Sequence, residues 1–251
     1  MHLTLVRNAT LEIRMAGLRL LVDPQLDPAG ARPAVPDTPN PRRNPLVDLP
    51  EPLEALVAGL DAVLVTHMHQ DHFDDTARRL LPRGISILCQ PEDAARLRDD
   101  GFTDVRPVAD EARLGDVAIS RTGGRHGTGE IGRAMAPVSG FVLDAPGELK
   151  LYIAGDTILC DEVRDALARH RPDVAVVNAS AARFLEGDPI VMSADDVVAL
   201  ARHAPDLHIV AVHLEAIAHA TETRADLRAR LQAEGLTDRV AVPEDGSEVP
   251  L

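Results

Sequence analysis

The feature that most constrains this chain is a group of histidines directly after a short apolar run. Residues 62–65, Ala-Val-Leu-Val, are typical of a buried strand, and residues 66–72 read Thr-His-Met-His-Gln-Asp-His. In an extended chain, alternate side chains point to the same face, so His67 and His69 can bind one metal ion. A strand that ends in such a pair indicates a metal site at the edge of a sheet.

The next two polar residues extend this pattern. Asp71 and His72 follow where the chain turns toward a helix, and they can reach a second ion beside the first. Imidazole and carboxylate groups suit zinc, iron and manganese. A chain of this composition has such a pattern by chance about once in a thousand, so a solvated histidine-rich turn is the weaker interpretation.

Three further candidate ligands come directly after predicted strands. His126 follows a strand at 117–122 and a Gly-Gly pair, Asp156 follows a strand at 149–154, and His213 ends a strand at 207–212. Sites in α/β proteins form at strand ends. Together with the first motif, they make seven candidate ligands at four strand ends.

The rest of the chain predicts an α/β fold. Strands are expected at 2–7, 11–15, 18–22, 61–66, 85–89, 117–122, 140–144, 149–154, 174–177, 207–212 and 239–242. Helices are expected at 75–81, 92–99, 161–170, 194–203 and 224–233. Residues 166–173 and 199–206 resemble one another, which predicts two similar helix–strand units on one sheet.

One segment breaks this alternation. Residues 24–52 hold nine of the chain's nineteen prolines, so regular structure cannot continue through them. Loops of this length in a compact domain are usually functional or disordered. We expect one domain over residues 1–251, in which this loop is a flap over the site. The alternative is a subunit contact, which would make the protein a homo-oligomer.

Composition narrows the classes of partner. The net charge of −14 opposes binding to a phosphate backbone, and four Phe, one Tyr and no Trp give few platforms for stacking bases. We therefore expect a small-molecule substrate rather than nucleic acid. No apolar run is long enough to span a membrane. We expect no secretory signal and a cytoplasmic location, because the first residues lack a basic region with a long apolar stretch and the two cysteines fit a reducing compartment.

Four motifs resemble those of the metallo-β-lactamase superfamily: THMHQDH (66–72), GGRHG (123–127), AGDT (154–157) and VHLEA (212–216). The similarity is greatest to the branch that includes L-ascorbate-6-phosphate lactonase and N-acyl phosphatidylethanolamine phospholipase D, and LLVDP (20–24) supports that placement. The resemblance implies an αββα four-layer sandwich, in which two mixed β-sheets are flanked by helices.

The resemblance also implies a ligand assignment. One ion would lie on His67, His69 and His126 and the other on Asp71, His72 and His213, with Asp156 bridging the two. Two divalent ions are expected, with zinc preferred over manganese or iron. Antibiotic-degrading members commonly lack a histidine at the position of His72, so penicillin hydrolysis is not expected here.

The function implied is that of a metal-dependent hydrolase with a dinuclear centre. A metal-bound hydroxide would cleave an ester, lactone or phosphodiester in a small molecule. Asp71 is the candidate catalytic residue, which orients the nucleophile and moves its proton. Two alternatives are an oxidoreductase similar to the mononuclear iron sulfur dioxygenases and a non-catalytic metal-binding protein.

Three residues are weaker candidates. Glu215 and His219 lie just beyond His213 and, if a helical turn starts there, share a face. They would bind the substrate or protonate a leaving group, or else orient His213 and cap the turn. Asn178 ends a strand and is a candidate for the rim of the site, although turn formation is the more common role. Asp23, at another strand end, is also expected to form a turn.

Overall fold

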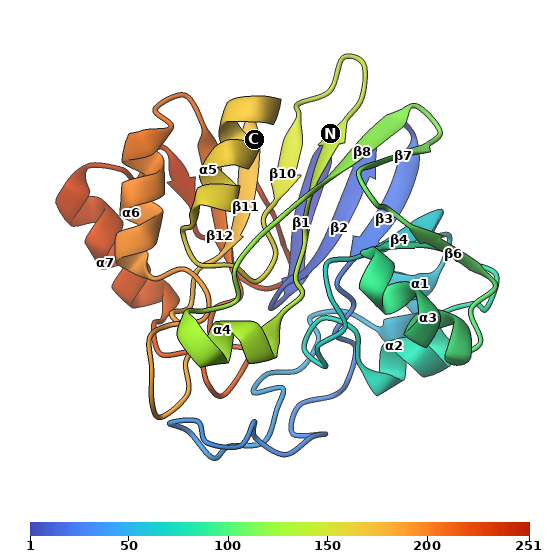
Figure 1. Ribbon diagram of the computed structural model, residues 1–251, viewed down its shortest axis with the longest axis horizontal. Helices are drawn as coiled ribbons and strands as arrows, with labels where there is room; N and C mark the ends of the chain where they lie inside the picture. Colours follow the sequence, from blue (N-terminus) through green and yellow to red (C-terminus); the bar gives the residue numbers. More distant parts are fainter.

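The computed structural model describes residues 1–251 and contains two seven-stranded sheets (Figure 1). The first sheet consists of β1 (His2–Arg7), β2 (Thr10–Met15), β3 (Leu18–Val22), β4 (Ala62–Val65), β5 (Ser86–Cys89), β6 (Asp104–Pro107) and β14 (Ser247–Glu248). Its order is β14-β1-β2-β3-β4-β5-β6. β1 to β3 are antiparallel, and β3 to β6 are parallel.

The second sheet is also mixed. It consists of β7 (Glu111–Leu114), β8 (Val117–Thr122), β9 (Gly140–Asp144), β10 (Leu151–Ile153), β11 (Val174–Asn178), β12 (His208–Val212) and β13 (Val240–Ala241). Its order is β13-β12-β11-β10-β9-β8-β7, and the strands from β10 to β13 are parallel. Parallel neighbours bring the ends of β10, β11 and β12 to one edge, which is where candidate ligands follow.

Helices cover the outer face of each sheet, which gives four layers (Figure 1). On the first sheet lie α1 (Leu53–Val57), α2 (Asp75–Leu80) and α3 (Ala94–Asp99), the last of which follows a 3-10 turn at Pro91–Asp93. On the second lie α5 (Asp161–His170), α6 (Ala194–His203) and α7 (Arg224–Glu234). This is the expected αββα sandwich. No helix is long and apolar enough to cross a membrane.

Three apolar cores hold these layers together. A cluster of 23 buried residues takes side chains from both sheets and fills the space between them. A cluster of 24 joins the second sheet to its helices, and one of 16 joins the first sheet to its helices. Strands buried on both faces read as continuous apolar runs, which is why β4 and β11 have no polar alternation.

The predicted elements largely agree with those observed. α5 and α6 begin and end at the predicted residues, and each leads into a parallel strand of the second sheet, as the internal repeat predicts. The helix expected at 92–99 is divided between the 3-10 turn and α3. The short elements α1, β6, β7, β14 and α4 (Gly129–Met135) were not expected.

The proline-rich segment contains no helix or strand, and one isolated bridge joins Arg32 to Asn44. Its base is fixed by Arg7, a fully buried side chain of β1. The Arg7 guanidinium donates hydrogen bonds to three backbone carbonyls, those of Gln25, Asp27 and Val47. The segment runs along the same end of the molecule as α4 (Figure 1).

Candidate metal centre

The loop between β4 and α2 presents four of the candidate ligands. A tight turn follows His69, whose carbonyl accepts hydrogen bonds from the backbone N–H groups of His72 and Phe73. Asp74 then caps α2 by accepting from the N–H of Ala77, which fixes where the helix begins. The turn therefore brings His67, His69, Asp71 and His72 together within one short stretch of chain.

Loops from the second sheet bring the other three. His126 follows β8, and its Nδ1 lies 2.8 Å from the carbonyl of Ile190, which orients the ring. Asp156 follows β10 after Gly155, which has a φ of +69°. A Cβ atom on Gly155 would lie 2.7 Å from the carbonyl oxygen of Ser139, so only glycine fits this turn. His213 directly follows β12.

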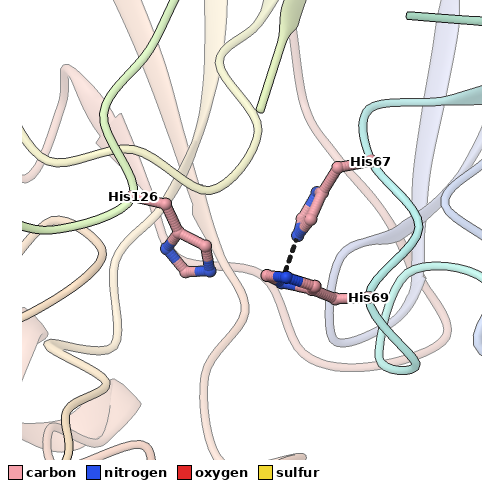
Figure 2. A group of neighbouring side chains, drawn as sticks. All are labelled: His67, His69 and His126. Carbon is pink, nitrogen blue, oxygen red and sulfur yellow. Dashed lines mark hydrogen bonds between the residues drawn. The ribbon is translucent and has the colours of Figure 1, made fainter. Parts of the chain in front are cut away.

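These seven side chains form two adjacent sets. His67, His69 and His126 make one set, and Asp71, His72, Asp156 and His213 make the other; within each set, one potential ligand atom per residue lies within 4.8 Å of the others. In the first set the imidazole rings converge on one point (Figure 2), and His67 Nε2 lies 2.9 Å from His69 Nδ1. The resemblance implied this grouping, with Asp156 shared between the two sets.

The distances from Asp156 place its carboxylate between the two sets. Its Oδ2 lies 3.3 Å from His126 Nε2 and 3.2 Å from His72 Nε2, and its Oδ1 lies 3.6 Å from His213 Nε2. Asn178 donates its Nδ2 to Asp156 Oδ1 at 2.5 Å. Asn178 is thus buried behind the carboxylate rather than at the rim.

Asp23 holds His72 from behind. Its Oδ2 lies 2.8 Å from His72 Nδ1, and Thr66 donates both its backbone N–H and its hydroxyl to the same carboxylate. A carboxylate that binds one ring nitrogen fixes the tautomer and leaves the other nitrogen for a metal. The backbone of Asp23 has a φ of +44°, as suits the expected turn. The sequence did not predict the contact of its side chain with His72.

Burial and charge set the protonation of the cluster. Burial lowers the pKa of His67 well below its usual value and lowers that of His69 to about 4, so both rings are neutral at pH 7. Burial opposes a charge on His72 as well, but Asp156 and Asp23 outweigh it and raise the pKa of His72. The second set therefore attracts positive charge.

Within the second set, two buried nitrogen atoms have no hydrogen-bond partner, namely Nε2 of His72 and Nε2 of His213. Buried polar groups are almost always paired, so unpaired imidazole nitrogens that face carboxylates need an explanation. A divalent cation between them would satisfy both nitrogens and the acidic charge. The donor set thus fits the metal that the motifs predict.

Glu215 and His219 are placed differently from each other. No helical turn follows His213, and Glu215 pairs with the buried Arg224, with Oε2 at 2.6 Å from Nη1. Glu215 is not among the residues that line the cavity beside the cluster. His219 is 7% exposed and lines a cavity that lies against the cluster.

A cavity of about 520 Å³ lies against the cluster. Its lining includes residues that the sequence did not single out: Arg32, Pro33, Ala34, Val35, Pro36, Asn44, Gln70, Met135 and Phe184. Six of these belong to the proline-rich segment, which therefore forms part of the cavity wall. No local pattern marks these residues, because their place depends on how the segment folds back.

Comparisons with known proteins agree with this geometry. Residues 18–214 match the model of the beta-lactamase superfamily domain. The UPF0173 protein YddR of Bacillus subtilis is 36% identical over 249 residues, with 98% of each chain covered. The structure of a possible metal-dependent hydrolase from Veillonella parvula has a TM-score of 0.97 and 33% identity, and covers 100% of this chain and 99% of its own.

A further solved structure carries a specific activity in its name. It is an isothiocyanate hydrolase from Delia radicum gut bacteria, with a TM-score of 0.95, 35% identity, and coverage of 100% of this chain and 99% of that one. The fold, the clustered histidines and aspartates, and these similarities agree. The chain belongs to the metallo-β-lactamase superfamily and, within it, to the UPF0173 family of metal-dependent hydrolases.

Proposed function

We propose that this hydrolase binds two divalent metal ions and cleaves a small, neutral molecule at an electrophilic carbon, with an organic isothiocyanate as the first candidate. The observation that carries the dinuclear part is the position of Asp156, whose two oxygens face histidines of both sets. His67, His69 and His126 would hold one ion, and Asp71, His72 and His213 the other, with Asp156 shared. Zinc suits this set best, with manganese and iron as alternatives.

When bound, such a pair of ions lowers the pKa of water toward neutrality and stabilises negative charge that develops on the substrate. Asp71 would orient the attacking water and accept its proton. Burial alone would raise the pKa of Asp71, but His72 and His213 outweigh it and hold the pKa well below its usual value. Its Oδ2 faces His213 Nε2 at 3.4 Å, which leaves Oδ1 to accept the proton.

Asn44 would supply a hydrogen-bond donor to the substrate. This side chain is 4% exposed and lines the cavity. Its Oδ1 accepts from the backbone N–H of Ala218 at 2.7 Å, which fixes the orientation of the amide. The Nδ2 group, which has no hydrogen bond within the protein, is then the free donor beside the cavity.

His219 would provide a second polar contact. Burial lowers the pKa of His219 below its usual value, so the ring is neutral at pH 7. Its Nδ1 is buried without a partner, and the residue lines the same cavity as Asn44. A neutral imidazole can donate a hydrogen bond to the nitrogen or oxygen that leaves.

The cavity favours a neutral substrate over a phosphodiester. Arg32 is its only cationic lining residue apart from the histidines, and its Nε is already paired with Asp27 Oδ2 at 2.8 Å. The net charge of −14 adds repulsion against anions. Esters and lactones fit the same argument and are the second candidates.

Hydrolysis of an isothiocyanate would use one water molecule. Water adds its oxygen to the central carbon of R–N=C=S, the carbon–nitrogen bond breaks, and both protons end on nitrogen to give R–NH₂ and O=C=S. The support for this substrate is the 35% identity, over the whole chain, with an enzyme of that name. The polar end of the cavity, with Asn44 and His219, would contact the nitrogen and sulfur.

Elemental analysis and turnover together test the proposal. The wild type should hold about two zinc or manganese ions per chain and release carbonyl sulfide from phenethyl isothiocyanate. His67→Ala should lose metal and activity, whereas the matched control His203→Ala, at an exposed helix end, should keep both. One ion per chain would refute the dinuclear centre. Activity on esters or lactones alone would replace the isothiocyanate by those substrates.

A further inference from the structure

A second hollow of about 380 Å³ lies beside the site cavity, between α4 and the loop that carries Phe184. We infer that this outer hollow binds the apolar substituent of the substrate; the inference rests on the proposed function, which supplies the reacting group. The outer hollow is lined by Asp37, Ile131, Ala134, Met135, Phe184, Leu185 and Glu186.

The outer hollow adjoins the site cavity. Met135 and Phe184 line both spaces, so these two side chains form their common wall. At the other end of the site cavity lie His69, Asp71 and Asp156. A molecule whose reacting carbon lies at the aspartates can therefore extend past Phe184 into the outer hollow.

Contacts within the protein fix the shape of this hollow. The N–H of Leu185 donates to the carbonyl of Asp37 at 2.7 Å, which joins its loop to the proline-rich segment. Thr128 donates its hydroxyl to Asp188 at 3.0 Å, which joins the same loop to the start of α4. Ile131, Met135 and Phe184 pack on a small buried cluster, so the hollow forms without a ligand.

The lining specifies the chemical class of its occupant. Leu185 is 65% exposed, more than any other large apolar side chain, and an apolar ligand would cover it. The only charged residues in the lining are the acidic Asp37 and Glu186, so a fatty-acid carboxylate would be repelled. A neutral alkyl or arylalkyl group matches this surface.

Substrate chain length tests the inference by kinetics. For n-alkyl isothiocyanates from methyl to octyl, kcat/KM should rise about fourfold per methylene until the hollow is filled, as expected for burial of a CH₂ group. Leu185→Asp should reduce the octyl-to-methyl ratio of kcat/KM about tenfold or more. The control Leu149→Asp makes the same change at an exposed leucine in the turn between β9 and β10 and should leave the ratio unchanged. A ratio near one in the wild type, with methyl isothiocyanate hydrolysed, overturns the subsite while the proposed function stands.

A binding measurement separates the two hypotheses. The chain has no tryptophan, so Phe184→Trp introduces a single indole at the common wall. Octanamide should shift its emission to shorter wavelength in a saturable way, acetamide should not, and adding Leu185→Asp should weaken octanamide binding. This result without any isothiocyanate turnover would support the subsite and reject the proposed substrate. Equal responses to octanamide and acetamide would overturn the subsite.

Discussion

The strand ends and the segments that cover them differ in almost every physical respect. The strand-end side chains are polar, mostly buried and held by hydrogen bonds from behind, as Asp23 holds His72 and Asn178 holds Asp156. The covering segments, residues 24–52, 129–135 and 181–190, meet the cavity with mostly apolar, partly exposed groups. In the proposed function, the strand ends therefore hold the metal ions and the covering segments contact the substrate.

The largest effect is expected at the residue that joins the two ligand sets. Asp156→Ala should remove the shared carboxylate and leave His72, His126 and His213 facing a void. We expect loss of about four orders of magnitude or more in kcat, together with loss of bound metal. Elemental analysis and turnover check this result. Full metal content in the variant would contradict the central position of Asp156.

The next effect separates metal binding from proton transfer. Asp71→Asn should keep the fold but lower kcat by roughly three orders of magnitude, because an amide cannot accept the proton of the attacking water. Circular dichroism, elemental analysis and steady-state kinetics are the measurements, and the metal content should stay that of the wild type. Near-normal turnover would show that Asp71 has no role in proton transfer, even if it contacts a metal.

The contact behind His72 should have a smaller effect. Asp23→Asn keeps the shape of the side chain but removes the charge that orients the imidazole, and we expect metal affinity or activity to fall roughly ten- to hundredfold. Metal affinity is measured by competition with a chelator. Asp173→Asn is the matched control, because the Asp173 carboxylate is exposed and accepts a hydrogen bond from the backbone N–H of Lys150, far from the site.

Asn44 is an exception to the difference between strand ends and covering segments, because it is a polar, buried residue on a covering segment. Asn44→Asp can still accept the N–H of Ala218 but replaces the free donor by an acceptor. We expect kcat/KM to fall about tenfold while metal content stays constant. An unchanged kcat/KM would show that Asn44 has only a structural role. The difference between strand ends and covering segments would then have no exception.

The smallest effect concerns the apolar covering loop alone. Gly187 has a φ of +90°, and a Cβ there would lie 2.6 Å from Ile131 Cδ1. Gly187→Ala should lower the free energy of unfolding by about 1–2 kcal/mol. Gly129→Ala, with a φ of +56° and no atom near its Cβ, is the control for backbone strain alone. Urea titration of both gives the contribution of the contact, and metal content should not change in either.

The same division explains what the sequence could predict. The metal-ligand candidates follow apolar strands, so their local pattern was sufficient to name them. The resemblance in four motifs then gave the superfamily and the sandwich, which the family match and the solved structures confirm. Among the three functions first considered, the metal-dependent hydrolase is the one that the family supports.

The remaining features depend on contacts between distant parts of the chain. α1 and α4 have five and seven residues, too few for a helix to be stable without packing. Asn44 reaches the cavity because Ala218, 174 residues away, fixes its amide. Phe184 and Met135 form the common wall only because α4 and the loop at 181–190 lie side by side. The sequence pattern within either segment does not predict this contact.

The way the proline-rich segment returns on itself affects how this enzyme could be changed. Gly30 N donates to the carbonyl of Pro45, and Arg32 pairs with Asn44, so the two ends of the stretch 30–45 lie side by side. Outside this stretch, the Arg7 side chain holds the base of the proline-rich segment through hydrogen bonds to three backbone carbonyls. Because the entropy of closing a loop grows slowly with its length, the tip can be lengthened, shortened or exchanged with little effect on the sheets. We therefore expect that residues 33–43 can be replaced to change the substrate specificity while the candidate metal ligands stay the same.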